Sequence, residues 1–146
     1  MKNKNNEYIV RIPLFVIFFW FGLLKPLGFS AAEPLVLKTV YWMPFFSAQV
    51  WLCIIGWWEV LIGIGFLFNK TTFPALILLL LQMSGTIMPL FILPDITFQN
   101  MNPFTPTLEG QYIIKNLFII AGAILIANKS LKKKIITDFY KQNTSN

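Results

Sequence analysis

The chain has 146 residues, of which 56% are hydrophobic and only 12% are charged, and its formal net charge is +6. Soluble domains typically carry about 25% charged residues, so this composition indicates an integral membrane protein of one domain. The chain contains a single cysteine and no histidine. This excludes an internal disulfide, a Cys-x-x-Cys redox pair, haem with histidine ligands and a zinc site of histidine and cysteine. We therefore expect no haem and no metal.

Four stretches are apolar and long enough to cross a bilayer as helices, which takes about 20 residues each. They cover residues 12–29, 47–68, 73–93 and 111–127, the last being short for a span. We predict an all-α, polytopic membrane four-helix bundle over residues 12–128, between an N-terminal segment 1–11 and a basic tail 129–146. The first apolar run is too long for a cleaved signal peptide, so we expect it to be a span.

The basic residues are distributed unevenly between the two sides of this bundle. With the N-terminus in the cytoplasm, nine of them lie on the cytoplasmic side: Lys2, Lys4, Arg11, Lys70, Lys129, Lys132, Lys133, Lys134 and Lys141. The outer connections then carry only Lys38. The positive-inside rule therefore predicts that both termini are cytoplasmic. The short connection at residues 69–72 predicts that the second and third spans form a helical hairpin.

The two connections on the outer side are longer, at residues 30–46 and 94–110. The second is rich in proline, threonine and asparagine, which fits neither a strand nor a span. Within it, Pro106 and Glu109 predict the start of a helix, with proline in the first turn and a carboxylate near the positive end of the helix dipole. We expect Glu33 and Glu109 to lie at the outer mouth of the bundle.

Each predicted span carries a glycine and a polar side chain on one face, because residues three or four apart share a face of a helix. The glycines that would let the helices approach closely are Gly22, Gly56, Gly63, Gly85 and Gly122. The polar residues are Lys25, Glu59, Gln82 and Lys115. We expect these four side chains to form a polar core, with Glu59 about midway along its span.

A charged group at the centre of a membrane span costs roughly 2.5–3.5 kcal/mol unless it is paired. We therefore expect Lys25 to reach Glu59, while Lys115 either provides a second partner or extends to the outer headgroups. Three interpretations of this core stay open. It is a structural clip that fixes helix register, a site for a small lipophilic or anionic ligand such as a quinone headgroup, or a path for protons or ions.

Several strings in the sequence resemble the DoxX-like superfamily of four-helix bacterial membrane proteins, and in particular its YkgB-type branch. Residues 20–25 read WFGLLK and residues 32–36 read AEPLV. The second span contains IGWWEVLIG at residues 55–63, similar to the family's Gly-x-x-Glu-x-x-x-Gly pattern. Residues 109–116, EGQYIIKN, are similar to the element that opens the family's fourth helix.

The resemblance implies a bacterial inner-membrane protein that works with a soluble or membrane oxidoreductase in quinone-linked redox chemistry or oxidative-stress defence. The sequence contains no catalytic motif, so we predict an accessory subunit that is non-catalytic or weakly catalytic. Its cofactor stays open, with quinone as a candidate. Nucleic acid is not expected as a partner, and a homo-oligomer is compatible with the sequence. The alternatives are a small transporter or permeability protein and a purely structural membrane assembly factor.

Overall fold

The computed structural model describes the backbone of residues 5–144 and the side chains of residues 7–132, 135 and 136. Within these residues every regular element is a helix, so the all-α prediction is confirmed. Four helices are long and apolar enough to cross a membrane, over Glu7–Leu24, Ala48–Leu67, Thr72–Ile92 and Leu108–Lys132. Some basic residues from the charge count lie outside this description: Lys2, Lys4 and the side chains of Lys133, Lys134 and Lys141.

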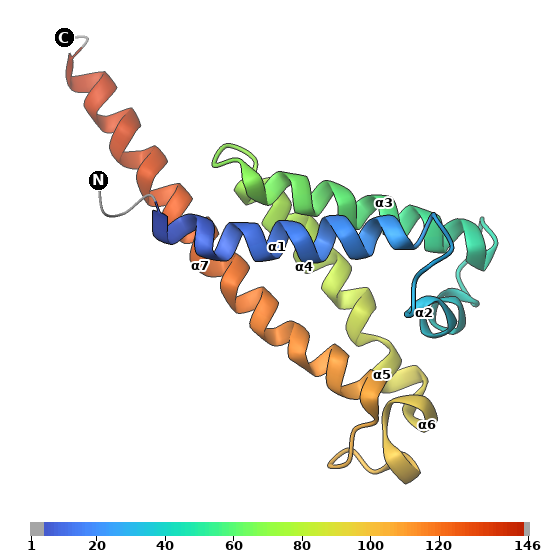
Figure 1. Cartoon of the computed structure of the whole chain (residues 1–146). Helices are drawn as coiled ribbons and strands as arrows, with labels where there is room; N and C mark the ends of the chain where they lie inside the picture. Colours follow the sequence, from blue (N-terminus) through green and yellow to red (C-terminus); the bar gives the residue numbers. More distant parts are fainter. Residues whose placement is uncertain (1–4, 145–146) are drawn as a thin grey trace.

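The long helices are α1 (Asn5–Leu24), α3 (Ala48–Leu67), α4 (Thr72–Ile87) and α7 (Leu108–Thr144). The short ones are α2 (Glu33–Val40), α5 (Pro89–Ile92), α6 (Pro94–Thr97) and the 3-10 turn η1 (Gln99–Met101). α2, α5 and α6 gather at one end of the bundle, which we call the α2 end (Figure 1). The start of α1 and the α3–α4 turn lie at the opposite end, which we call the Arg11 end. The predicted hairpin of the second and third spans is confirmed.

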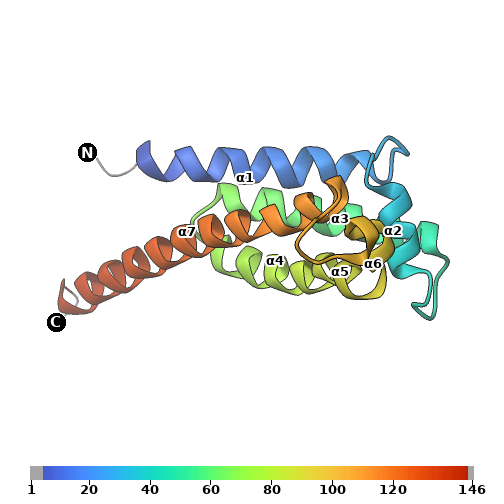
Figure 2. The ribbon, with the colours of Figure 1, turned by 90° about the horizontal axis from the view of Figure 1, so that it is seen from below.

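The four long helices form two pairs. α1 lies against α3 and α4 lies against α7, and the two pairs cross each other (Figures 1 and 2). The pairs meet toward the Arg11 end, whereas α4 and α7 diverge from α1 toward the α2 end (Figure 1). With 37 residues, α7 is about 55 Å long, so its C-terminal part extends beyond the bundle at the Arg11 end.

The first membrane helix begins and ends earlier than the predicted span of residues 12–29. α1 begins at Asn5, where Glu7 suits the positive end of the helix dipole and lies 3.7 Å from Arg11, one turn further on. It ends at Leu24 because Pro26 follows and Gly28 adopts a φ of 75°, which reverses the chain. Arg11 consequently lies inside the first span, and not in a separate N-terminal segment as predicted.

The third span, Thr72–Ile92, agrees with the predicted residues 73–93 but is interrupted, whereas the fourth, Leu108–Lys132, is longer than the predicted residues 111–127. α4 stops at Ile87 because Pro89, which has no amide hydrogen, starts the separate short helix α5. α7 begins at Leu108, where the amide of Gly110 donates to Oγ1 of the capping residue Thr107 at 3.3 Å. Pro106 therefore precedes the cap, so its predicted place in the first turn is wrong. The predicted basic tail is the continuation of α7.

Two of the predicted glycines bring α1 and α3 into backbone contact. A Cβ atom on Gly22 would lie 2.8 Å from the carbonyl oxygen of Gly56, and one on Gly56 would lie 2.7 Å from the carbonyl oxygen of Gly22. Gly63 extends this contact, since its Cβ would lie 2.8 Å from the amide nitrogen of Phe19. The prediction fails for Gly85, which has open space beside it, and Gly122 makes only an ordinary contact with Val10.

The apolar core lies where the two helix pairs cross. It consists of buried side chains from all four long helices: Leu14, Phe18, Ile62, Phe66, Ala75, Leu79, Met83 and Ala123. Lipid competes with these side chains for apolar contact, so close packing and polar contacts between helices must supply much of the stability in a membrane. Two separate clusters make polar contacts between these helices, one on each side of this core along α1.

Candidate functional site

Three polar side chains from three spans meet toward the α2 end of the bundle, and we call them the central cluster. The ammonium group of Lys25, just after α1, forms an ion pair with Glu59 Oε2 on α3. The Nε2 atom of Gln82 on α4 donates to Glu59 Oε1 at 2.6 Å. The side chains of Lys25 and Glu59 are only 7% and 14% exposed. The structure therefore contains the expected Lys25–Glu59 pair and adds to it Gln82, a predicted member of the polar core.

The glycine contact explains why Lys25 reaches Glu59. A Cβ atom on Gly56 would lie 2.9 Å from the Cβ of Lys25, and one on Gly22 would lie 2.9 Å from the Cβ of Glu59. The absence of side chains at both glycines leaves room for the two charged stems to run across the helix contact. A buried ion pair of this kind offsets the large cost of removing each charge from water.

The central cluster is not fully satisfied. Among the residues that the structure describes, two buried side-chain polar atoms have no hydrogen-bond partner, namely Gln82 Oε1 and Trp51 Nε1. The amide orientation of Gln82 is fixed by chemistry, because exchanging its oxygen and nitrogen would place a carbonyl against the Glu59 carboxylate. The cluster thus combines a neutralised carboxylate with a buried acceptor that lacks a donor. Buried polar groups without partners are rare and costly in folded proteins.

Lys115 does not join the cluster. It is exposed on α7, where its Nζ lies 5.4 Å from the centroid of the Tyr112 ring. The reason is that this part of α7 packs through Ile113, which is buried, and Lys115, two residues later, lies on nearly the opposite face of the helix. Of the two residues expected at the outer mouth, Glu33 is half-buried at the start of α2 and Glu109 is exposed in the first turn of α7.

A second polar cluster surrounds Arg11, whose side chain is only 2% exposed. Nη1 donates to the carbonyl oxygen of Phe66 at 2.6 Å and to Thr72 Oγ1 at 2.8 Å. Nη2 donates to Asn69 Oδ1 at 2.7 Å and to Ser130 Oγ at 2.8 Å. One guanidinium group therefore joins α1, the end of α3, the α3–α4 turn and α7.

The charge of Arg11 is balanced locally. Glu7 Oε2 lies 3.7 Å from Arg11 Nη2, and Glu7 Oε1 lies 3.7 Å from the ammonium group of Lys129. The acceptor at Phe66 is one of the last carbonyls of α3, which have no partner inside their own helix. Sequence reasoning used Arg11 only as a topology charge. The Glu7–Arg11 spacing of one helical turn was the available signal, but the acceptors on α4 and α7 leave no mark in the sequence.

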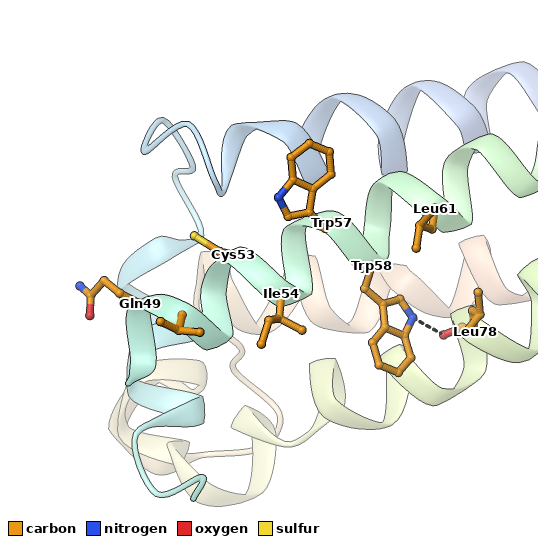
Figure 3. Close-up of a pocket in the computed structure, with 8 residues that line it drawn as sticks. Gln49, Cys53, Ile54, Trp57, Trp58, Leu61 and Leu78 are labelled. Atoms are coloured by element: carbon orange, nitrogen blue, oxygen red, sulfur yellow. Dashed lines mark hydrogen bonds between the residues drawn. The ribbon is translucent and has the colours of Figure 1, made fainter. Parts of the chain in front are cut away.

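A groove of about 560 Å³ lies along the outward side of α3 (Figure 3). Seven residues of α3 between Gln49 and Leu61 line it together with Leu78 of α4, and we call it the α3 groove. Its lining is almost entirely apolar. At the side nearest α4, Trp58 Nε1 donates to the carbonyl oxygen of Leu78 at 3.1 Å. The lining lies within two membrane-length helices, so its apolar character is compatible with contact with lipid.

Metal-binding side chains were also sought among the described residues. No group of three or more histidine, cysteine, aspartate or glutamate side chains among them is arranged to hold a metal ion. The thiol of Cys53 is free and half-buried on the α3 groove.

The chain was also compared with known proteins. No family model, no curated protein and no solved structure matches it. The resemblance to the DoxX-like superfamily consequently rests on the motifs in the sequence, two of which contribute to the central cluster: the glycine-lysine step at Gly22 and Lys25, and the glycine-glutamate step at Gly56 and Glu59.

Proposed function

We propose that this protein is an accessory membrane subunit that binds a quinone-type ligand at the central cluster and serves an oxidoreductase partner in oxidative-stress defence. The observation that carries the proposal is the buried, unpartnered Oε1 atom of Gln82 beside the Lys25–Glu59 pair. A quinol hydroxyl is a donor that this acceptor fits, and its aromatic ring suits the apolar surroundings. The DoxX-like resemblance supports the redox setting.

We place the protein in the bacterial inner membrane with both termini in the cytoplasm. The Arg11 end carries Arg11, the turn residue Lys70, and Lys129 and Lys132 on α7, whereas Lys38 lies on α2 at the other end. This charge difference supports a cytoplasmic Arg11 end. A reporter enzyme fused after Asn146 is expected to be active in the cytoplasm, and a periplasmic signal would overturn this orientation.

The ligand proposal is tested on the full chain, purified from membranes of a quinone-producing host and reconstituted into lipid nanodiscs. We expect bound quinone in the purified protein, and quinol binding that weakens about tenfold in Gln82→Leu, the effect of losing one buried hydrogen bond. Gln111→Leu is the matched control, because Gln111 is exposed on α7. Unchanged quinone content and affinity in a folded Gln82→Leu variant would reject the proposal. Co-purification of an oxidoreductase would identify the partner.

A purely structural clip is the second candidate, and a specific observation favours it. The Lys25–Glu59 pair lies directly beside the close contact of Gly22 and Gly56, where it would fix the register of α1 against α3. On this alternative, Lys25→Met and Glu59→Gln would lower stability while ligand content stayed at background level. The absence of quinone from the purified wild-type protein and from quinol-soaked nanodiscs would favour the clip.

A further inference from the structure

The central cluster and the α3 groove are formed by neighbouring residues of the same two helices, α3 and α4. On α3, Trp58 borders the groove and Glu59, the next residue, belongs to the cluster. On α4, Leu78 borders the groove, and Gln82, four residues later on the same helical face, belongs to the cluster. The Trp58–Leu78 hydrogen bond therefore borders the groove (Figure 3), and the unpartnered acceptor of Gln82 belongs to the next turn of α4.

We infer that the seam between α3 and α4 is the lateral entrance of the central cluster, through which an amphiphilic ligand comes from the bilayer. In this arrangement a hydroxyl-bearing ring donates to Gln82 Oε1, and a long apolar tail stays behind in the α3 groove. This inference rests on the proposed quinol site and adds the chemical class of the whole ligand: a polar ring on an apolar chain. Trp58 is the positioning residue that closes the entrance.

Two observations support this route. The groove is almost entirely apolar, as a tail requires, and Leu78, which lines it, lies one helical turn before Gln82 on α4. The indole of Trp58 packs against the apolar core, and its one polar contact among the described residues is the hydrogen bond to the backbone carbonyl of Leu78, which a side-chain rotation breaks.

The tail is tested by comparing two probes, a decyl-substituted quinol and the same quinol ring without the tail, with full-length protein in nanodiscs. Affinities are expressed per mole of lipid, so that partitioning of the tail into the bilayer does not contribute. We expect the decyl quinol to bind at least about tenfold more tightly. Val50→Trp places a large side chain in the groove at a position that is 43% exposed, and it is expected to abolish this tail advantage without weakening the bare ring.

The entrance is tested by binding rates. Trp58→Phe keeps an aromatic ring but removes the indole N–H, so we expect association and dissociation of the decyl quinol to become about threefold to tenfold faster. Trp57→Phe is the matched control, because Trp57 lines the same groove and is exposed. Equal affinity for both probes, a tail advantage that survives Val50→Trp, or equal rates in the two tryptophan variants would overturn the lateral entrance while leaving the quinol site intact. Binding of neither probe would instead reject the quinol site itself.

Discussion

The two polar clusters both contain a cation from the α1 segment, yet they differ in how completely they are satisfied. Arg11 donates four hydrogen bonds to four different residues and lies close to Glu7. Lys25 pairs with one carboxylate, and the chain of contacts ends at an acceptor with no donor. A closed network in an apolar bundle serves stability, whereas an open one leaves capacity for a ligand. We therefore interpret the network around Arg11 as structural and call it the Arg11 clamp, whereas the central cluster is a candidate site.

The largest expected effect comes from breaking the Arg11 clamp. Arg11→Ala leaves buried acceptors without donors and Glu7 without its neighbour, so we expect the free energy of unfolding to fall by about 3–5 kcal/mol. Unfolding in mixed micelles with increasing denaturing detergent measures it. Arg11→Lys keeps the charge but loses the planar fork, so it should restore only part of the stability. Wild-type stability in Arg11→Ala would mean that the clamp is not structural.

A double-mutant cycle on the central pair is expected to show a smaller effect. Lys25→Met alone leaves the Glu59 carboxylate buried and unpaired, whereas the double variant with Glu59→Gln removes both charges. We expect a coupling energy of about 1–3 kcal/mol between the two positions from the same unfolding measurement. Additive effects of the two single variants would contradict a direct interaction between Lys25 and Glu59. The central cluster would then lack the ion pair on which its comparison with the Arg11 cluster rests.

The glycine contact that supports the central cluster is tested with a matched pair of variants. Gly22→Ala places a Cβ atom 2.8 Å from a backbone carbonyl oxygen of α3, so it should cost about 1–3 kcal/mol and loosen the Lys25–Glu59 pair. Gly85→Ala meets nothing within 4 Å, and the gain in helix propensity should leave stability equal or slightly higher. Equal losses in both variants would contradict the close approach of α1 and α3.

The smallest effect is expected at Lys115. Its side chain is exposed and stays outside both clusters, so Lys115→Met should change the free energy of unfolding by less than about 0.5 kcal/mol. Quinol affinity should also be unchanged. A loss comparable to that of Lys25→Met would show that α7 closes onto the cluster in the membrane, and Lys115 would then belong to the polar core as the sequence suggested.

Of the four residues predicted for the polar core, helical spacing correctly selected the three that form the central cluster. It failed for the fourth, Lys115. Each of the three correctly selected residues shares a helical face with a glycine of its own span. Such a shared face is a local property of one helix, so it can be recognised from the sequence. The position of Lys115 relative to them depends on which face of α7 packs against the bundle, namely that of the buried Ile113, and no spacing within α7 reports that choice. Gly85 fails for the same reason, since α4 reaches no neighbour at that position.

The sequence alone determined that the chain is helical, that four segments can span a membrane and that a lysine and a glutamate on glycine-bearing faces would be paired. Apolar length, helical period and the cost of unpaired charge in lipid are sufficient for these conclusions. Only the tertiary structure decided that Arg11 is a buried clamp, that Lys115 faces outward and that Gln82 retains an unpartnered atom. Those outcomes depend on the crossing of two helix pairs, which brings together residues more than fifty positions apart, such as Arg11 and Phe66.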